Sequence, residues 1–467
     1  LGMRTRFLSV FFVVFFVSVA VTQTSDPWSV VDQALQKGID TYGYPGCVAI
    51  VGDADGVLYW KAFGNYTYGK PVPMNDNTNP PMNLNTIFDM ASCTKVTGAT
   101  SAAAQFYQRG ELDLSTPVWK FLGEAYKQNG KEAITVLNCL LHDAGYPPDP
   151  SPNYWEPAFG CPQTSFEYPQ EDFSCQEKIF NGLLAQTLEN PVGEVYVYSD
   201  LSFITLQYVV GYLARTLDYV QEQDIIPGCY QGTQASDMCY FEAYLRKFVF
   251  KAIGMRNTAF LPAHDVWSSC APAENDTIEQ TYQNILLQGQ VSDGNAYALG
   301  GIAGHAGIFS DAADMFTLGH RVMFAGQYSG VDGFINETTA TYFTTEYNNT
   351  QSCRALGWST NDPTTVDEGW NLACGNLSAK TWTHIGYTGT QICGDPTREL
   401  VTIFLTNRVY PVSQNNQMHT YRQNFNNAVI EALDSSSLSR TELRKLGTSH
   451  VPPHMMWKPQ PSFRSLE

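Results

Sequence analysis

Positive charge is scarce in this chain of 467 residues, in which 27 lysines and arginines stand against 45 aspartates and glutamates, a formal net charge of −18. Proteins bind nucleic acids and anionic membranes through clustered positive charge, so the composition argues against both partners. Histidine is rare as well, with 8 residues. His450 and His454 have helical spacing, but Pro452 and Pro453 between them exclude a regular helix. We expect no metal there, and no metal or other cofactor elsewhere.

Long apolar runs are also missing, and the chain has no internal repeat. The apolar stretch 7–17 is shorter than the ~20 residues that a membrane-spanning helix needs. It follows Arg4 and Arg6 and precedes the small residues 18–20, the pattern of a secretory signal peptide. We predict a signal peptide over residues 1–22, with an uncleaved anchor as the alternative. The protein is then secreted, or lies in the lumen of the secretory pathway, with no stable membrane insertion after cleavage.

Cysteine, in contrast, is well represented with 11 residues, and five Asn-x-Ser/Thr sequons accompany it. Both features suit an oxidising secretory compartment. Two pairs are close enough in sequence for local disulfides, Cys161 with Cys175 and Cys229 with Cys239. A later segment holds three cysteines whose pairing the sequence leaves open, namely Cys353, Cys374 and Cys393. An odd number leaves at least one thiol unpaired, and Cys93 is the candidate.

The most informative stretch is Ser92-Cys93-Thr94-Lys95, the one S-x-x-K sequence in the chain. A serine hydroxyl needs a base within hydrogen-bond reach to act as a nucleophile. On a helix that begins at Ser92, Lys95 lies on the same face one turn further on, whereas the rival nucleophile Cys93 points about 100° away. The helix dipole favours an alkoxide on Ser92 and disfavours charge on Lys95. A chance S-x-x-K is the alternative, so the assignment depends on partners further along the chain.

Strand-like segments occur at both ends of the chain and helical ones between them. Helices are predicted over 29–37, 133–141, 198–216, 241–254 and 424–433, and hairpins over 47–63 and 388–406. We predict an α/β (α+β) fold, a three-layer sandwich of an antiparallel sheet flanked by helices, with a mostly helical region. The catalytic domain would span 25–434, with its sheet part about 25–91 and 296–434 and its helical part about 92–295. Residues 435–467 are polar and expected to form a disordered tail.

Tyr198-Ser199-Asp200 precedes one of the apolar helical runs. Ser199 or Asp200 is a good N-cap for that helix. A tyrosine whose phenolate is stabilised by a lysine can carry a proton to and from a serine, so Tyr198 is a candidate partner of Ser92 and Lys95. A capping turn with a core tyrosine is the alternative.

His384-Ile385-Gly386-Tyr387 lies on a predicted strand edge. Gly386 allows the backbone of a substrate to approach, and the strand can hold an acyl group and add one oxyanion donor. His384 could hydrogen-bond Tyr198 or a substrate carboxylate. A structural histidine in a glycine-rich turn is the alternative.

His305 lies among the glycines of residues 300–307. No Gly-Lys-Ser/Thr follows, so a phosphate-binding loop is excluded. His305 and these glycines are candidates for the pocket wall, with a purely structural turn as the alternative.

These motifs, in this order, resemble the serine β-lactamase and penicillin-binding-protein superfamily, and within it the class C-like β-lactamase-related carboxypeptidases and esterases. The stretch 291–309 is similar to a subgroup of bacterial penicillin-binding-type carboxypeptidases. The resemblance runs from about Gly43 to Leu433. The other segments that carry it are Phe88–Lys95, Leu112–Val118, Cys139–Pro147, Gly254–Thr258 and Leu405–Arg408.

The resemblance implies a role for each motif residue. Ser92 would be the acylated nucleophile, Lys95 would activate it, and Tyr198 would shuttle the proton in acylation and deacylation. His384 would take the place of the lysine in the family's K-T-G box. The N–H groups of Ser92 and Tyr387 would form the oxyanion hole.

The substrate is bounded by two departures from the family pattern. Asp200 stands where many members carry Asn, and an ionised carboxylate only accepts hydrogen bonds, whereas an amide also donates them. With His384, this argues against efficient β-lactam hydrolysis. We expect a secreted serine hydrolase acting on a small-molecule ester or a peptide-like amide, including one with a D-amino-acid terminus. A non-catalytic binding or scaffold homologue and a true β-lactamase are the alternatives.

Overall fold

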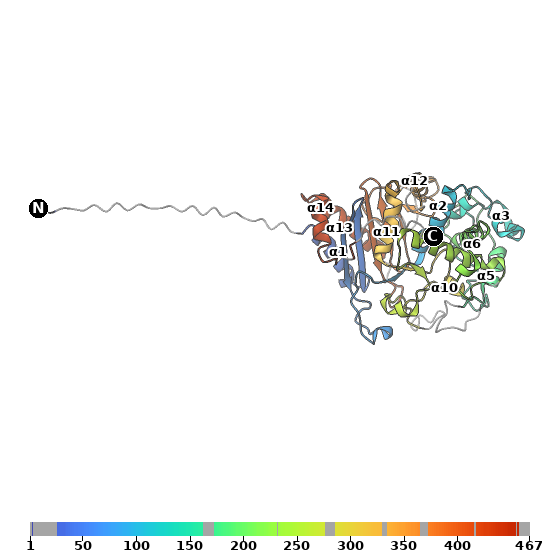
Figure 1. The fold of residues 1–467 in the computed structure, drawn as a ribbon, viewed down its shortest axis with the longest axis horizontal. Coiled ribbons are helices and arrows are strands. Elements are labelled where there is room, and N and C mark those ends of the chain that lie inside the picture. Colours follow the sequence, from blue (N-terminus) through green and yellow to red (C-terminus); the bar gives the residue numbers. More distant parts are fainter. Residues whose placement is uncertain are drawn as a thin grey trace.

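The two ends of the chain meet in one antiparallel sheet, and the helical middle lies beside it (Figure 1). The computed structural model describes residues 2, 26–161, 172–230, 232–275, 285–328, 334–364, 372–414, 417–453 and 455–456. The strands of the sheet are β1 (Gly46–Asp53), β2 (Gly56–Gly64), β6 (Ser359–Thr360), β7 (Trp382–Ile385), β8 (Gln391–Asp395) and β9 (Leu400–Thr406). Neighbours are antiparallel in the order β2–β1–β9–β8–β7–β6. The predicted fold class is confirmed.

The predicted signal peptide over 1–22 lies outside the described residues apart from Gly2. Among the described helices, none is both long and apolar enough to cross a bilayer. The signal peptide therefore stays a prediction.

β1 is a fully buried inner strand, next to the edge strand β2, and its sequence is apolar on both faces. All its residues are buried, and it pairs with β2 on one side and β9 on the other, where Ile50 lies opposite Ile403. The first predicted hairpin is thus confirmed. The second is present as β8 and β9, but it begins at Gln391 rather than Thr388. Gly386 donates its N–H to the Thr390 carbonyl, which closes a tight turn between β7 and β8.

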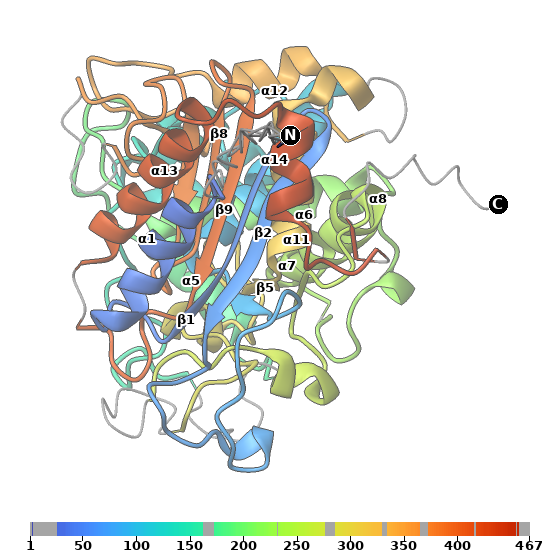
Figure 2. The same ribbon diagram turned by 90° about the vertical axis from the view of Figure 1, so that its left-hand side faces the viewer.

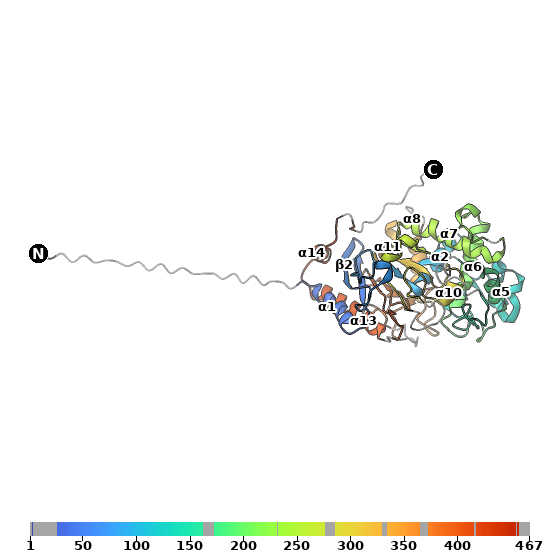
Figure 3. The ribbon, with the colours of Figure 1, turned by 90° about the horizontal axis from the view of Figure 1, so that it is seen from below.

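Helices cover both faces of the sheet, as predicted. α1 (Ser29–Asp40) and α13 (Met418–Asp434) lie side by side in front of the strands in Figure 2. Their apolar residues, among them Leu35 and Phe425, form one core with Phe404 of β9. α11 (Ala312–Met323) covers the other face, between the sheet and the helical region (Figure 3). The ring of Phe316 fills the space that a side chain at Gly52 would need.

The prediction of a disordered tail over 435–467 is wrong for Arg440–Gly447, which form helix α14. Ser439 and Glu442 make a reciprocal capping box, each accepting a hydrogen bond from the other's N–H, which fixes the start of the helix. Leu443 is buried, and its carbonyl accepts the indole N–H of Trp28 at 2.9 Å. The polar composition concealed a helix with a single buried apolar position at its centre.

The middle of the chain folds mainly into helices around α6 (Asp200–Thr216), most of which is buried. The other helices are α2 (Ser101–Gln108), α3 (Trp119–Leu122), α4 (Val136–Leu141), α5 (Gln176–Ala185), α7 (Asp237–Tyr244), α8 (Lys251–Ile253), α10 (Gly294–Ala298) and, later in the chain, α12 (Glu337–Thr344). A second small sheet, in the order β3 (Phe88–Asp89), β5 (Ile308–Ser310) and β4 (Ala259–Phe260), lies at the border with the main one. β3 leads directly into the S-x-x-K segment.

Disulfides join both cysteine pairs that were predicted, Cys161–Cys175 and Cys229–Cys239. A third joins Cys374 to Cys393, which settles the choice that the sequence left open. Three disulfides are consistent with an oxidising compartment. The cysteines of the described residues that lie outside these disulfides are all buried, namely Cys47, Cys93, Cys139, Cys270 and Cys353.

Replacing Leu443 by Ala is expected to lower the free energy of unfolding by about 2–4 kcal/mol, because a buried leucine leaves a cavity. Leu446→Ala is the matched control, since Leu446 lies on the same helix but is 39% exposed. Urea denaturation of both variants measures the difference. Equal, negligible effects would contradict the docking of α14.

Candidate active site

A tight turn at the end of β3 presents Ser92. The Asp89 carboxylate accepts a hydrogen bond from the Ala91 N–H at 2.8 Å, and Ala91 has a φ of 46°. The chain then forms a 3₁₀ turn (Ala91–Cys93) that continues into the helical segment ending with α2. The two neighbours of Ser92 are buried, whereas Ser92 itself is half-buried. Its hydroxyl is therefore the reactive group of this turn that solvent can reach.

Lys95 lies one turn beyond Ser92 and is fully buried. Its Nζ is 3.2 Å from Ser92 Oγ, 2.7 Å from Asp200 Oδ1 and 3.2 Å from the carbonyl oxygen of His305. An ammonium group has three N–H donors and no acceptor, so it donates to each of these oxygens. The structure thus joins four of the sequence candidates around one nitrogen.

The charge on Lys95 is set by Asp200. Burial by itself lowers the pKa of a lysine, but the Asp200 carboxylate and then Tyr198 raise the pKa of Lys95 above its usual range. Lys95 is therefore an ammonium at neutral pH. The expectation that the helix dipole disfavours this charge is corrected, because a full opposite charge at 2.7 Å outweighs a partial dipole charge.

Neither Ser199 nor Asp200 caps α6 with its side chain, contrary to the prediction. Ser199 Oγ donates to the Pro147 carbonyl oxygen at 2.6 Å, and Asp200 binds Lys95 instead. The N–H of Asp200 donates to the Pro148 carbonyl oxygen at 2.8 Å, which fixes the residue in place. α6 thus begins with a carboxylate that its own helix dipole stabilises.

Tyr198 precedes α6 and lies beside Lys95, whose Nζ is 4.8 Å from the ring centroid. Its hydroxyl oxygen is buried. Burial raises the pKa of Tyr198, while the charge of Lys95 and hydrogen bonding to Lys95 and Ser92 lower it, and the net shift is upward. Tyr198 is a phenol at neutral pH, in hydrogen-bonding range of the two residues with which the sequence associated it.

Two residues that the sequence did not indicate hold the Tyr198 ring. His142 lies against it with ring centroids 4.6 Å apart, and its Nδ1 accepts the Ser199 N–H at 3.0 Å. Burial and then the charge of Arg354 lower the pKa of His142 well below its usual range, so the ring is neutral. The guanidinium carbon of Arg354 is 5.2 Å from the Tyr198 ring centroid, and the group donates to the hydroxyl of Tyr196.

His384 is fully buried on β7, with Nδ1 2.9 Å from the Ile385 carbonyl oxygen. A carbonyl accepts only, so the proton is on Nδ1 and the other ring nitrogen, Nε2, carries a lone pair. Burial and then Arg354 lower the pKa of His384 well below its usual range. The residue in the place of the K-T-G lysine is therefore neutral and offers an acceptor, not a positive charge, to the site.

The turn after β7 is fastened to the nucleophile segment. Thr388 Oγ1 donates to the Asp89 carbonyl oxygen at 2.7 Å, and Thr390 Oγ1 to that of Met90 at 3.0 Å. A side chain at Gly386 would meet the Met90 carbonyl oxygen at 2.6 Å, so only glycine fits there. The hydroxyl of Tyr387, the next residue, donates to Glu274 at 2.8 Å.

His305 is fully buried, and its Nε2 is 2.9 Å from Asp293 Oδ1. One nitrogen or oxygen atom each of His305, Asp293 and Asp200 lies within 4.8 Å of the others, a spacing that could suit a metal ion. Asp200 already holds the Lys95 ammonium, and Asp293 holds the imidazole. We therefore treat the three as partners of Lys95 and of one another.

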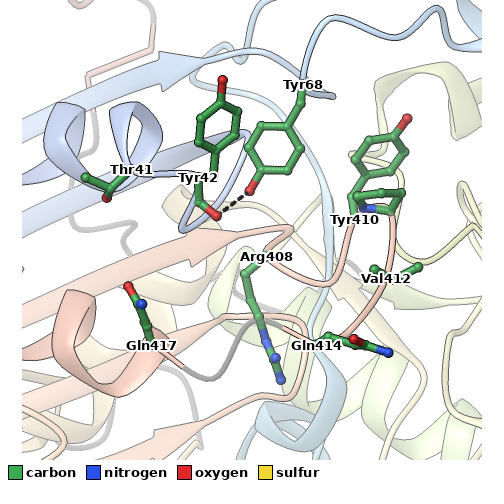
Figure 4. A pocket seen from close by; sticks show the side chains of 9 residues that line it. Thr41, Tyr42, Tyr68, Arg408, Tyr410, Val412, Gln414 and Gln417 are labelled. Carbon is green, nitrogen blue, oxygen red and sulfur yellow. Dashed lines mark hydrogen bonds between the residues drawn. The ribbon is translucent and has the colours of Figure 1, made fainter.

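A separate hollow of about 350 Å³ is lined by residues that include Thr41, Arg408 and Gln417. Its wall includes Tyr42, Tyr68 and Tyr410, and the carbonyl of Tyr42 accepts the Tyr68 hydroxyl (Figure 4). Arg408, also on its wall, donates from Nε to the Tyr387 carbonyl oxygen at 2.6 Å. None of the candidate residues lines this hollow, so it is not the site at Ser92.

Known proteins resemble this chain in both sequence and fold. The sequence matches the family described as "Beta-lactamase" over residues 31–426. The chain belongs to the β-lactamase family. A curated relative from Salmonella typhi, named "Putative D-alanyl-D-alanine carboxypeptidase", is 26% identical over 405 residues, which are 81% of this chain and 82% of the relative.

Solved structures confirm the β-lactamase fold at low identity. EstCE1, described as a hydrolase with promiscuous acyltransferase activity, superposes with a TM-score of 0.60 and 18% identity over 86% of this chain and 98% of its own. A penicillin-binding protein homologue from Caulobacter crescentus gives 0.59 and 14% over 87% and 98%. The resemblance to the serine β-lactamase and penicillin-binding-protein superfamily is thereby confirmed.

In this β-lactamase-family site, Asp293, Arg354 and Asp89 are the residues that sequence reasoning missed, along with His142. His142 and Asp293 lie inside stretches that resemble the family, and that was the available signal. Arg354 lies in no such stretch. It reaches the site from a part of the chain far from Tyr198, so only the fold identifies it.

Asp200→Asn is expected to shift the pH dependence of the reaction of Ser92 with a fluorophosphonate toward lower pH. A raised pKa keeps the proton on Lys95 until high pH, and replacing the carboxylate removes the largest effect that opposes burial, so the pKa falls. Labelling rates across the neutral and alkaline range measure the shift. Asp237→Asn, which removes a buried carboxylate paired with Arg215, is the control and should leave the profile unchanged. A shift to higher pH would contradict the assignment.

Proposed function

We propose that this protein is a secreted serine hydrolase of the β-lactamase family that acts through an acyl-enzyme on Ser92. The observation that carries the proposal is the 3.2 Å approach of the buried Lys95 ammonium to Ser92 Oγ, with Tyr198 beside both. A buried charge is costly, and clusters of shifted pKa values around a reachable nucleophile are typical of active sites. The substrate class is an ester or a peptide-like amide.

In this scheme Tyr198 is the base. Both Tyr198 and Lys95 hold their protons at neutral pH, so the reactive form is the one in which the pair has lost one proton. The Lys95 ammonium stabilises the phenolate, which takes the Ser92 proton as Oγ bonds to the substrate's carbonyl carbon. The proton then passes to the leaving alcohol or amine. In deacylation water gives a proton to Tyr198 and its oxygen bonds to the acyl carbon, and Ser92 leaves with that proton.

The tetrahedral oxyanion requires fixed donors, for which we propose the N–H groups of Ser92 and Tyr387. Support comes from the threonine contacts that hold the β7–β8 turn to Asp89 and Met90. Gly386 adds to this support, because it lets the two backbones approach each other.

The substrate preference follows from the charges of the site. A neutral His384 with a lone pair on Nε2 provides no positive charge for a substrate carboxylate, and the Asp200 carboxylate repels one. Penicillins and cephalosporins carry a carboxylate, so an ester or an amide without a neighbouring carboxylate is the better substrate. The names of the relatives span both chemistries, acyl transfer by EstCE1 and the carboxypeptidase of Salmonella typhi.

The proposed secretion is supported by the three disulfides, which form and persist in oxidising compartments. The signal-peptide pattern over residues 1–22 also supports secretion.

Cys93 is a poor alternative nucleophile. It is buried, and its thiol donates to the His384 carbonyl oxygen at 3.6 Å. Burial raises the pKa of Cys93 to about 11, so it is a thiol and not a reactive thiolate at neutral pH.

The test is covalent labelling with a fluorescent fluorophosphonate and a fluorescent penicillin, comparing wild type with Ser92→Ala and Cys93→Ala. Wild type and Cys93→Ala should take up the fluorophosphonate, and Ser92→Ala should not. The penicillin should label more slowly, for want of a carboxylate partner. No labelling of wild type by either probe would overturn the enzyme assignment, and labelling that survives Ser92→Ala would move the nucleophile. Turnover of an aryl ester, a D-Ala-D-Ala peptide and a cephalosporin then ranks the substrates.

A further inference from the structure

We infer that Asp293 and His305 form a positioning pair that holds Lys95 in place for the reaction at Ser92. The inference rests on the proposed function and adds to it two residues that do not touch the reacting atoms. They act through one main-chain carbonyl and through their charges.

His305 makes one contact through its main chain and another through its side chain. Its carbonyl oxygen accepts one of the three Lys95 N–H groups at 3.2 Å, while its imidazole, fully buried, is 2.9 Å from Asp293 Oδ1. The side chain therefore fixes the residue whose main chain contacts the lysine. Without the contact to Asp293, the imidazole would no longer fix His305, and the His305 carbonyl oxygen would move away from Lys95.

Asp293 is itself fixed relative to the nucleophile. Its Oδ1 accepts the Ala296 N–H at 2.8 Å and so caps α10. The preceding residue, Ser292, donates its N–H to Asp89 Oδ2 at 2.8 Å, and the other oxygen of Asp89 accepts from Ala91. The Asp89 carboxylate thus connects the turn that carries Ser92 with Ser292, the residue before Asp293.

The loop that carries His305 is held from both sides. Gly304 donates to Gln207 Oε1 of α6 at 2.6 Å, and a side chain at Gly304 would meet the Phe203 carbonyl oxygen at 2.2 Å. Ile308 donates to Thr94 Oγ1 at 3.1 Å, between Ser92 and Lys95 in sequence. These contacts fix the loop at residues 304 and 308. Between them, the contact of the His305 imidazole with Asp293 sets the direction of the His305 carbonyl.

The pair also acts on the charge of Lys95. Burial lowers the pKa of His305, but Asp293 and then Asp200 raise it above its usual range, which favours the imidazolium. Burial raises the pKa of Asp293, whereas the charge of His305 and its hydrogen bond lower it to about 2. The titratable and charged groups that surround Lys95 are Asp200, Tyr198, Asp293, His305, Asp149, Cys93, His142 and His384. Within this set, the two members of the pair have opposite effects on the lysine.

The test measures the rate of fluorophosphonate labelling of Ser92 against pH in His305→Phe, His305→Gln and Asp293→Asn. His305→Phe should slow labelling about 10- to 100-fold, the cost of a misplaced catalytic group. His305→Gln keeps an N–H donor for Asp293 and should recover most of the rate. Asp293→Asn keeps an acceptor for the α10 cap, which preserves the fold.

The pH profiles separate positioning from mere support of the fold. His305→Phe removes a positive charge near Lys95 and should move the profile to higher pH. Asp293→Asn removes a negative charge but also the main group that raises the pKa of His305, so it should move the profile less. The matched control is His320→Phe, because His320 is a buried histidine of α11 bonded to the Tyr328 hydroxyl at 2.7 Å. It should change neither rate nor profile.

The outcomes distinguish the two proposals. If wild type is not labelled, the proposed function fails and this inference with it. If wild type is labelled but the His305 and Asp293 variants keep its rate and profile, the positioning role is overturned and the function stands.

Discussion

The ion pair between Lys95 and Asp200 is the constraint on which the site depends. A lysine without any solvent exposure keeps its charge only if an opposite charge lies at hydrogen-bond distance, and Asp200 provides it at 2.7 Å. Because Lys95 follows β3 and Asp200 begins α6, the same pair ties the nucleophile segment to the helical region. Ser92 therefore has a cation beside it whose position and charge both come from another element.

The residues around this pair form two groups, those that would react and those that orient them. In the proposed mechanism Ser92, Lys95 and Tyr198 carry the chemistry, and each belongs to a short motif. Their orientation comes from His142, Arg354, Asp89 and the Asp293–His305 pair, which contact them through backbone groups and ring faces. Such contacts need no fixed sequence spacing. A mutation of one of these orienting residues would change the geometry and charge of the site without removing a reacting atom.

The sequence predicted the parts whose partners are close along the chain. Short-range patterns located the β1–β2 hairpin, two disulfides, and the turn that places Lys95 against Ser92. Contacts such as Asp89 with Ser292, or Arg354 with Tyr198, join residues more than 150 positions apart, and no periodicity encodes them. The charge of Lys95 was misjudged for the same reason, because its deciding neighbour lies 105 residues away. The missed helix α14 differs, since its capping box was legible but its polar composition was given more weight.

The β7–β8 turn, held by Thr388 and Thr390 to the residues just before Ser92, has a consequence for the newly made chain. Strand β1 lies between β2 and β9, so its edge toward β9 stays open until residues 400–406 have left the ribosome. A nascent chain thus has its nucleophile early and its oxyanion donor almost last. On the proposed mechanism the site is incomplete until synthesis is nearly finished, and a chain that ends before β7 would keep Ser92 but lack the Tyr387 N–H.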